Sequence, residues 1–500
     1  MAGLRGNGNK LFYGDNLDIL RRKIKDETVD LCYIDPPFNS KRNYNQIYNN
    51  IGGEDRAQAQ AFTDTWIWDD HAIAGFDEIL GNAEGRFQPK LVELIKGLDH
   101  VLGRGSLLAY LVSMALRATE IQRVLKSTGS FYLHCDPTAG HYLKILLDAV
   151  FCPLGGEYRN EIIWCYRKWS VAAGQFVSNH DNIHFYTKSR LKSTFNVLFG
   201  APSPGTMKRW KGQKQQAVFE DGVRKATSLE GQQAKSPMPD WWDISIINPN
   251  ADERQGYPTQ KPESLLDRVV AASSNEGDTV LDAYCGCGTT IAVAQRLKRK
   301  WIGMDITYQS ISLVLRRLEQ TFGPSVLKNI VTDGIPRDMK SAHALAHKKD
   351  DRLRKEFEKW AVLTYTNNRA VINDKKGADA GIDGVAFFKT GARDNAKIVF
   401  QVKSGGVKRG DIATLRGDMD REQAALAVLI TLEEPSAPMK AEAKGAGQFK
   451  HEDMGRSYDK ISIVTVREIV DDEKRLEIPM SLEVLRAAKK ADQTEQMDLL

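Results

Sequence analysis

The sequence predicts an α/β protein with an open, Rossmann-like sheet, followed by a smaller α/β domain. Three patterns predict this architecture. An apolar run ends in an acid and two prolines at 31–38, a strand runs into a glycine-rich loop at 279–290, and a late strand at 398–403 carries a Gln-x-Lys pair. Each pattern places polar residues where a buried strand ends, which is where open α/β sheets bind their ligands.

The first pattern reads as a buried parallel strand, because residues 31–34 are all apolar. The chain continues as Asp35-Pro36-Pro37-Phe38. Two prolines fix two φ angles and remove two backbone donors, so the chain leaves the sheet in one rigid shape. The Asp35 carboxylate and the Pro36 carbonyl can then accept both N–H bonds of an exocyclic amine, while Phe38 stacks on its ring. Taken alone, a strand followed by a Pro-Pro turn explains this stretch equally well.

The second pattern is a strand at 279–282, a loop containing Gly286 and Gly288, and a helix at 291–297. Glycine lets the backbone approach a ligand closely at the top of a strand. A further strand at 301–305 ends in Asp305, at the spacing of about 20 residues where an acid can bind two ribose hydroxyls. This order indicates a nucleoside-cofactor site. The loop lacks the third glycine of the dinucleotide fingerprint.

Together these stretches resemble the amino-methylating, S-adenosylmethionine-dependent DNA methyltransferases over roughly residues 10–320. Further matching segments lie at 11–15, 129–136, 160–164 and 257–266. The Asp-Pro-Pro-Phe form, rather than Ser-Pro-Pro, implies the adenine-N6 type within that family. The catalytic stretch precedes the glycine loop, which is the circularly permuted order of the β class, and α/β domains tolerate such permutation because their termini often lie close together.

The resemblance implies site-specific methyl transfer from S-adenosylmethionine to adenine N6 in double-stranded DNA, with the base rotated out of the helix, and a restriction-modification or defence role. Cytosine N4, RNA, or a DNA-binding module without catalysis remain alternatives. The implied catalytic residues are Asp35, Pro36, Pro37 and Phe38. The implied cofactor-binding residues are Asp15, Lys261, Asp282, Tyr284, Gly286, Gly288, Thr289 and Asp305.

Two of these residues carry a second interpretation. Asp15 is expected near the cofactor adenine, but it suits a helix N-cap for 16–25 equally well, and both roles can hold. Lys261 is expected to bind a carboxylate or phosphate, and its alternative is an exposed residue in a first helical turn.

A basic insert at about 188–245 is predicted to recognise the target sequence. Between 188 and 235, ten lysines and arginines face three acids, with aromatic residues interleaved. Such side chains suit phosphate contacts and base reading, and a solvated surface segment is the alternative. The candidate DNA-binding residues are Lys208, Arg209, Trp210 and Lys211.

We predict a methyltransferase domain at 1–325, a linker at 326–350 and a second domain at 351–500. In the second domain, Gln401 and Lys403 are two apart on a strand and so share a face. With Asp383 they resemble the Mrr-like branch of restriction-endonuclease folds, which implies a nuclease-like site with Mg2+ at Asp383. Gln401 stands where most of the wider superfamily has Glu, and an amide is a weaker ligand for Mg2+. An active nuclease and an inactive DNA-binding fold are therefore equally open.

Composition excludes little. The chain has 500 residues, 42% hydrophobic and 27% charged, with net charge +5, which is ordinary globular material. Six scattered cysteines without a CxxC pair indicate neither a disulfide framework nor a zinc site, which fits a cytoplasmic location. We expect no signal peptide and no membrane span. Double-stranded DNA is the expected partner, with a homodimer or a restriction or specificity subunit as further possibilities.

Overall fold

The computed structural model describes most of the chain. The described residues are 8–37, 42–47, 58–64, 66–168, 174, 176–202, 204–211, 213–220, 223–233, 235–248, 251–255, 257, 259–347, 351–373, 381–390, 395–451 and 455–478. Phe38 lies outside them, as do the side chain of Trp210 and Pro258 of the segment before the glycine loop.

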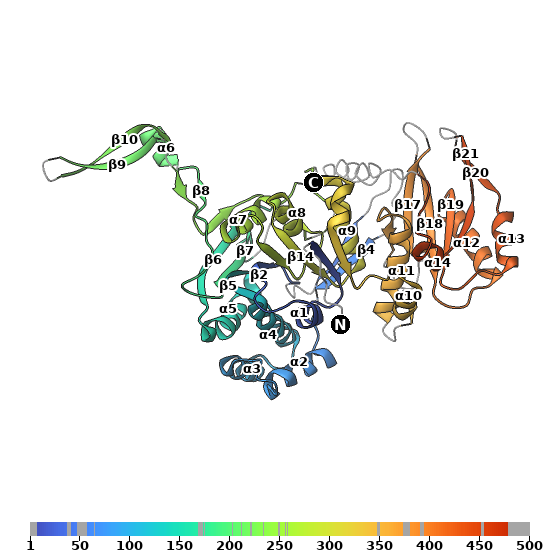
Figure 1. The fold of residues 1–500 in the computed structure, drawn as a ribbon, viewed down its shortest axis with the longest axis horizontal. Coiled ribbons are helices and arrows are strands. Elements are labelled where there is room, and N and C mark those ends of the chain that lie inside the picture. Colours follow the sequence, from blue (N-terminus) through green and yellow to red (C-terminus); the bar gives the residue numbers. More distant parts are fainter. Residues whose placement is uncertain are drawn as a thin grey trace.

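The larger domain is built on a nine-stranded sheet, which confirms the predicted α/β class (Figure 1). Six neighbouring strands run parallel, from β5 to β15, and β7 is antiparallel to both β5 and β6. In spatial order the strands are β12 (Trp241–Asp243), β6 (Glu157–Cys165), β7 (His180–Thr187), β5 (Leu125–Cys135), β2 (Val29–Ile34), β13 (Thr279–Asp282), β14 (Lys300–Asp305), β1 (Asn9–Tyr13) and β15 (Ile330–Asp333).

Side chains of the central strands alternate between two helical layers, as the two-residue period of a strand requires. Leu31 and Tyr33 lie in one buried cluster, and Cys32 and Ile34 lie in the other. The first cluster contains residues of α7 (Glu263–Ser273), α8 (Thr289–Arg296) and α9 (Tyr308–Phe322). The second contains residues of α1 (Asn16–Lys23), α2 (Asp70–Gly81), α3 (Pro89–Leu102), α4 (Ser106–Val124) and α5 (Pro137–Phe151). A sheet covered on both faces explains why 31–34 is apolar throughout.

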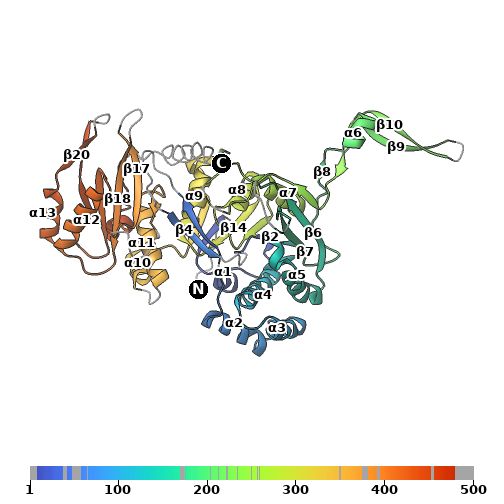
Figure 2. The same cartoon turned by 180° about the vertical axis from the view of Figure 1, so that it is seen from behind.

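Much of the basic insert forms an arm that projects from the body of the domain (Figures 1 and 2). Its two long strands, β9 (Gln213–Glu220) and β10 (Val223–Gln233), pair as an antiparallel ribbon. The rest of the arm comprises β8 (Phe199–Gly200), α6 (Pro204–Trp210) and β11 (Ser236–Pro237). A second hairpin, β3 (Arg42–Ile47) with β4 (Gln58–Asp64), follows β2 in the sequence.

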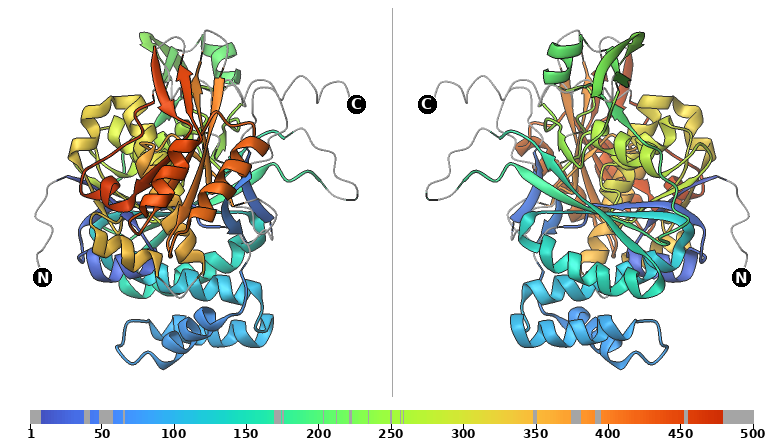
Figure 3. Two further views of the ribbon diagram at one scale, coloured as in Figure 1. Left: turned by 90° about the vertical axis from the view of Figure 1, so that its right-hand side faces the viewer. Right: turned by 90° about the vertical axis from the view of Figure 1, so that its left-hand side faces the viewer.

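The smaller domain has a five-stranded sheet, seen at the front of the left view of Figure 3. Its order is β16 (Val371–Ile372), β17 (Gly384–Lys389), β18 (Asn395–Lys403), β19 (Leu426–Thr431) and β22 (Ile461–Thr465). Helices α12 (Arg409–Arg421) and α13 (Ala437–Gly445) contribute to one buried cluster of this domain, and α11 (Asp351–Tyr365) and α14 (Val466–Val470) to another. A short hairpin, β20 (Gln448–His451) with β21 (Arg456–Asp459), adds to the outer end.

The predicted linker at 326–350 contains regular structure. Strand β15 joins the edge of the nine-stranded sheet beside β1. The helices η2 (Pro324–Asn329) and α10 (Met339–Ala346) flank this strand in the sequence. Elsewhere in the larger domain, a short helical turn, η1 (Cys152–Leu154), follows α5. Four residues of Ile-Val-Thr-Asp in a charged segment make too short a pattern to distinguish an edge strand from a loop. The domain boundaries stay a proposal.

The two domains share one continuous apolar core. A single buried cluster includes residues of α9 and α11, together with Ala342, Leu345 and Ala346 of α10. The six cysteines all fall in the described residues and all are free. None of the helices in the described part of the chain is both long and apolar enough to cross a membrane.

Candidate functional site

Asp35 follows directly on the last residue of β2, at the carboxyl edge of the parallel sheet. The next strand on one side is β13, with Leu281 opposite Cys32. The glycine loop that follows β13 therefore leaves the same edge of the sheet as Asp35. Open α/β sheets bind ligands at this position. The structure thus brings two of the sequence-predicted segments, 247 residues apart by the count from Asp35 to Asp282, onto neighbouring strands.

The partner of Asp35 is Lys261, whose Nζ lies 2.5 Å from the Asp35 Oδ2. The lysine reaches it from the segment just before α7 and also donates to the Thr259 carbonyl oxygen at 3.5 Å. Both side chains are largely shielded, with 11% and 17% exposure. Because shielding strengthens a charge pair, Lys261 fixes the Asp35 carboxylate at the end of β2. A role for Lys261 at a cofactor carboxylate stays a prediction.

The glycine loop requires its glycines. Gly286 and Gly288 have φ of +48° and +76°, in the left-handed region that side chains with a Cβ rarely adopt. A Cβ on Gly286 would meet the Tyr257 ring at 3.2 Å, and one on Gly288 would meet Val314 Cγ2 at 2.8 Å. The loop therefore lies against α9 and Tyr257 with no room for larger residues, and it leads directly into Thr289, the first residue of α8.

Two acids flank this loop. The Oδ1 of Asp282 accepts from the Tyr284 N–H at 3.0 Å, and burial raises the pKa of the Asp282 carboxyl to about 7. The Oδ2 of Asp305 accepts from the Gly286 N–H at 2.9 Å, and its Oδ1 accepts from the Thr307 N–H at 3.0 Å. Burial also raises the pKa of Asp305, and these N–H donors limit the rise.

Asp15 caps α1, as its second interpretation predicted. Its Oδ1 accepts from the N–H groups of Leu17 and Asp18, at 2.9 and 3.2 Å. Its Oδ2 pairs with Arg117 at 2.9 Å. The neighbouring Asn16 donates to the Ala283 carbonyl oxygen at 2.7 Å, so the start of α1 is tied to the beginning of the glycine loop. Contact with a cofactor adenine stays a prediction.

Sequence reasoning missed Arg317. This arginine on α9 is almost completely buried, and it donates to the Thr289 hydroxyl at 3.0 Å and to Glu263 at 2.7 Å. It therefore holds the start of α8 and the start of α7 together behind the loop. In the sequence Arg317 is one more charged residue on an amphipathic helix, so nothing there indicated this buried role.

A chain of hydrogen-bonded polar side chains links β2 to β5 and β7. His134 is fully buried, with its Nδ1 2.8 Å from the Tyr33 hydroxyl and its Nε2 3.2 Å from Asp181. Tyr166 also donates to Asp181, at 2.9 Å. Burial opposes ionisation of Asp181, but the hydrogen bond and charge of His134 together with Lys261 hold the pKa of this carboxyl below its usual range. This chain stiffens the sheet next to Asp35.

The basic arm is exposed. Lys208, Arg209 and Lys211 lie on or just after α6 with exposed side chains. On the ribbon, Phe219 and Val223 are 71% and 59% exposed. An antiparallel ribbon with exposed basic and apolar side chains has the dimensions that the major groove of DNA admits.

The nuclease-like residues gather around β18. The Oδ2 of Asp383 accepts from the Val402 N–H at 2.6 Å, and Gln401 donates its Nε2 to the Gly381 carbonyl oxygen at 2.8 Å. The buried Oε1 of Gln401 has no partner among the described residues. Lys403 lies 3.8 Å from Asp411 on α12. Burial and then the charge of Glu358 on α11 raise the pKa of Asp383 to about 7. The described residues contain no cluster of three His, Cys, Asp or Glu that could hold a metal ion.

This pKa makes stability depend on pH. The folded chain holds a proton on Asp383 that the unfolded chain, with a pKa of 3.8, releases, so stability is lost as pH rises from about 4 to about 7. We expect Asp383→Asn to raise the melting temperature by a few degrees at pH 8 and to change it little at pH 4. A shift of a few degrees corresponds to about 1 kcal/mol of unfolding free energy in a domain of this size. Scanning calorimetry measures both.

The matched control for that prediction is Asp420→Asn, which removes an exposed carboxylate from α12. Solvent screens its charge, so its effect should be small at both pH values. A melting temperature for Asp383→Asn that shifts equally at pH 4 and pH 8 contradicts the prediction.

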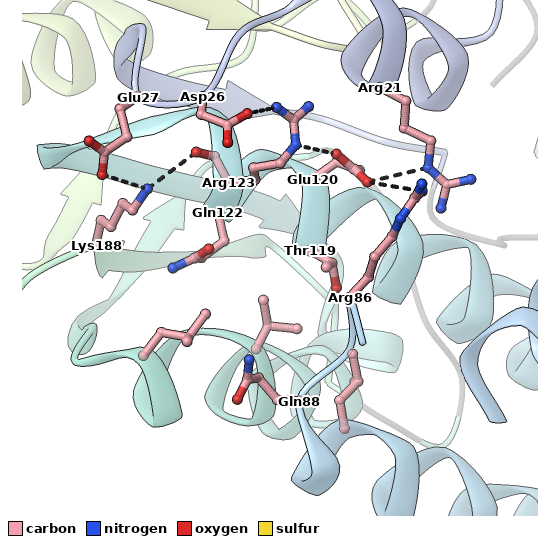
Figure 4. Close-up of a pocket in the computed structure, with 13 residues that line it drawn as sticks. Arg21, Asp26, Glu27, Arg86, Gln88, Thr119, Glu120, Gln122, Arg123 and Lys188 are labelled. Carbon is pink, nitrogen blue, oxygen red and sulfur yellow. Dashed lines mark hydrogen bonds and ion pairs between the residues drawn. The ribbon is translucent and has the colours of Figure 1, made fainter. Parts of the chain in front are cut away.

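A cavity of about 850 Å³ lies elsewhere (Figure 4). Its lining includes Glu27, just before β2, and Lys188, just after the antiparallel β7. It therefore opens at the amino edge of the parallel strands, opposite Asp35. Its charges pair with one another: Glu120 contacts Arg21 and Arg123, at 3.3 and 2.6 Å, and Lys188 contacts Glu27 at 3.5 Å. The cavity is therefore lined by charged groups that pair with one another, away from the edge of the sheet that carries Asp35.

A mostly parallel sheet with a glycine loop at one strand end and an acid at the next defines a Rossmann-like, nucleotide-cofactor class of protein. Residues 29–316 match the model of the DNA methylase family that includes both N6 and N4 types. The chain belongs to this DNA methylase family. Residues 353–471 match the model described as NACHT-associated inactive restriction endonuclease 1.

Individual relatives share part of their length with this chain. It is 30% identical to the type II methyltransferase M.HpaI of Haemophilus parainfluenzae over 203 residues, covering 41% of this chain and 57% of that protein. It is 28% identical over 316 residues to the DNA adenine methyltransferase YhdJ of Escherichia coli, covering 63% of this chain and 84% of that protein. A solved structure of M1.HpyAVI with S-adenosylmethionine aligns at 14% identity, covering 62% of this chain and 98% of that one, with a TM-score of 0.33.

Proposed function

We propose that this protein transfers a methyl group from S-adenosylmethionine to adenine N6 at a specific site in double-stranded DNA. The observation that carries the proposal is the placement of Asp35-Pro36-Pro37 on the strand beside the glycine loop. This arrangement puts an acceptor for an amino group next to a place for a nucleoside cofactor. The names of M.HpaI and of the adenine methyltransferase YhdJ support it.

In the proposed reaction Asp35 and the Pro36 carbonyl accept the two amino hydrogens of the flipped adenine, and Phe38 stacks on its ring. These acceptors draw the nitrogen lone pair out of conjugation with the ring, which increases its nucleophilicity. The attacking nitrogen becomes positively charged, and the nearby carboxylate stabilises that charge and the loss of the proton. The rigid Pro-Pro segment contributes the remaining rate acceleration by holding the target amine in position.

The glycine loop suits the cofactor by its shape. The left-handed φ at Gly286 and Gly288 leaves bare backbone at the edge of the sheet, where a Cβ would fill the space beside Tyr257 and Val314. Asp305 is assigned to the ribose hydroxyls, Asp15 to the adenine side, and Asp282, Tyr284 and Thr289 to the rest of the pocket. When bound, S-adenosylmethionine would supply an electrophilic methyl group, its S–C bond would break to leave a neutral thioether, and the proton displaced from the amine would pass to solvent.

The test is methylation of unmethylated genomic DNA by the purified protein with S-adenosylmethionine, followed by single-molecule sequencing and mass spectrometry of the nucleosides. We expect N6-methyladenine at one short sequence. N4-methylcytosine would instead support the second candidate, since an Asp-Pro-Pro site also accepts the exocyclic amine of cytosine. No modified base in DNA that the protein binds would reduce it to a binding module.

We propose that the basic arm recognises the target. Lys208 and Arg209 are exposed on α6, which lies in the same arm as the β9–β10 ribbon (Figure 1). We expect the Lys208→Ala/Arg209→Ala variant to weaken DNA binding and to reduce the slope of log K against log salt by roughly 0.9 for each phosphate that the variant no longer neutralises. Fluorescence anisotropy at several salt concentrations measures this slope.

The control for the arm is Lys328→Ala/Lys340→Ala, which removes two positive charges within the predicted linker, in η2 and α10. It should leave the slope unchanged if the arm neutralises the phosphates. An equal decrease in the slope for both double variants would show a diffuse charge effect and contradict the assignment.

We propose that the smaller domain binds Mg2+ weakly and does not cut DNA. Asp383, the nearby Glu358 and the Oε1 of Gln401, which has no hydrogen-bond partner among the described residues, offer the oxygen ligands that Mg2+ takes. The neutral Gln401 makes this site weaker than one with a third carboxylate. Mg2+ should raise the melting temperature of the protein at pH 8 but not that of Asp383→Asn, and no nicked plasmid should form. Nicking by the protein that Asp383→Asn abolishes would show an active nuclease.

The type II names of the relatives lead us to propose a restriction-modification role. A homodimer or a restriction or specificity subunit is the corresponding partner, to be sought by light scattering and co-purification. A cytoplasmic location is likewise proposed, from the free cysteines.

A further inference from the structure

Glu356 belongs to the smaller domain but its carboxylate bonds to the larger one. It lies on α11, which begins the nuclease-like match. Its Oε2 accepts from the Tyr308 N–H at 2.8 Å and from the Tyr13 hydroxyl at 3.4 Å. The residue is 8% exposed, so these bonds are shielded from solvent.

Both partners of Glu356 adjoin Asp305, the acid assigned to the cofactor ribose. Tyr13 is the direct neighbour of Asp305 across the β1–β14 pairing, and the next residue, Gly14, donates its N–H to the Asp305 carbonyl oxygen at 2.9 Å. Tyr308 follows Asp305 by three positions and begins α9. The rings of Tyr13 and Tyr308 meet edge to face with centroids 6.0 Å apart.

The amino-terminal end of α9 stabilises a carboxylate such as that of Glu356. Tyr308 is the first residue of a 15-residue helix, and its N–H is among the first four that no helical carbonyl can accept. A carboxylate there is stabilised by the N–H group and by the helix dipole. Lys359, one turn further along α11, supplies the counter-charge at 2.9 Å from the Glu356 Oε1. Glu356 is thereby paired on both sides and held in one position.

We propose that Glu356 is a positioning residue for the cofactor site, so that the nuclease-like domain completes the methyltransferase. By holding Tyr308 and Tyr13, Glu356 fixes the turn from β14 to α9 on which Asp305 is placed. The inference rests on the proposed function only in assigning Asp305 to the cofactor. With this role for Glu356, helix α11 contributes to the methyltransferase site and does not only connect two independent domains.

A second bond between the same helices provides a matched control. The Tyr308 hydroxyl lies 3.2 Å from the Thr364 hydroxyl of α11. Thr364→Val removes this interdomain bond with little change in shape, but it acts on the far end of the Tyr308 side chain and not on the turn after Asp305. It therefore measures domain docking without the positioning effect.

The experiment is titration calorimetry of S-adenosylmethionine into the full-length protein and its Glu356→Ala and Thr364→Val variants, with hydrogen exchange of residues 305–310. For Glu356→Ala we expect the Kd to rise about fivefold or more, as for a typical coupling between sites, with faster exchange in this turn. The KM for S-adenosylmethionine should rise with little change in kcat. Thr364→Val should stay within about twofold in Kd, well below that coupling range.

Three outcomes are distinct. An unchanged Kd for Glu356→Ala, or an equal rise for Thr364→Val, overturns the positioning role. Absence of S-adenosylmethionine binding in the unmodified protein would contradict the proposed function instead. If Glu356→Ala does not fold, Glu356→Asp decides, because it keeps the charge but shortens the side chain, which draws the carboxylate away from the Tyr308 N–H. A Kd above that of the unmodified protein, with faster exchange in the turn, supports the role, and an unchanged Kd and exchange rate overturn it.

Discussion

Replacing Asp35 by alanine is expected to abolish methyl transfer to DNA while the protein still folds and binds S-adenosylmethionine. The carboxylate is proposed to accept an amino hydrogen and to stabilise the charge that develops on the attacking nitrogen. Loss of a single preorganised electrostatic partner typically costs about 10²- to 10³-fold in kcat. The loss here should be at least that large, because Lys261 at 2.5 Å would be left as an unbalanced positive charge beside the target amine.

Transfer of labelled methyl groups to unmethylated DNA measures the effect on activity, and calorimetry measures cofactor binding. Asp35→Asn is the matched variant, since it keeps the size and one acceptor oxygen but loses the charge, and its activity should fall between those of the unmodified protein and Asp35→Ala. Full activity of Asp35→Ala would contradict the assignment of the catalytic site. Loss of cofactor binding together with activity would move Asp35 from the target base to the cofactor pocket.

Replacing Gly288 by alanine is expected to weaken cofactor binding and to destabilise the larger domain. The residue has φ +76°, which costs a non-glycine residue roughly 1–3 kcal/mol. Its Cβ would also lie 2.8 Å from Val314 Cγ2 on α9. The loop can relieve that clash only by moving, and it would move where the cofactor is proposed to lie. We expect a decrease in affinity for S-adenosylmethionine of tenfold or more, about 1.4 kcal/mol.

Two further variants separate the causes. Gly277→Ala meets the same left-handed backbone, φ +88°, but its Cβ has open space, so it reports the strain alone and should spare cofactor binding. Val314→Ala combined with Gly288→Ala removes the clash and should recover part of the affinity. If Gly277→Ala impairs binding as much as Gly288→Ala, the loop has no special role at the cofactor.

The elements of the larger domain were predictable because their signals are local. The apolar run before Asp35 became β2, and the strand, glycine loop and helix became β13 and α8. A short edge strand escaped this reasoning: β15 lies in the segment predicted as a linker, because edge pairing needs only four residues and depends on β1, more than 300 positions away.

The partners within the site were less predictable. Lys261 is 226 residues from Asp35, and Glu356 is 343 residues from Tyr13. No periodicity or spacing in the chain encodes such pairs. The sequence indicated a cofactor role for Lys261, whereas the structure pairs it with the Asp35 carboxylate. Arg317 and Glu356 look in the sequence like ordinary charges on amphipathic helices.

The sequence by itself determined the α/β class, the permuted order of the two central patterns and the presence of a nuclease-like domain. These follow from hydrophobic period, proline and glycine geometry, and residue type, which act over a few neighbouring residues. Only the tertiary structure decided that Asp35 faces Lys261, that Arg317 supports the glycine loop and that Glu356 crosses the domain boundary. Those contacts arise when strands, loops and helices far apart in the chain bury their apolar side chains together and bring charged side chains within reach of one another in the shielded interior.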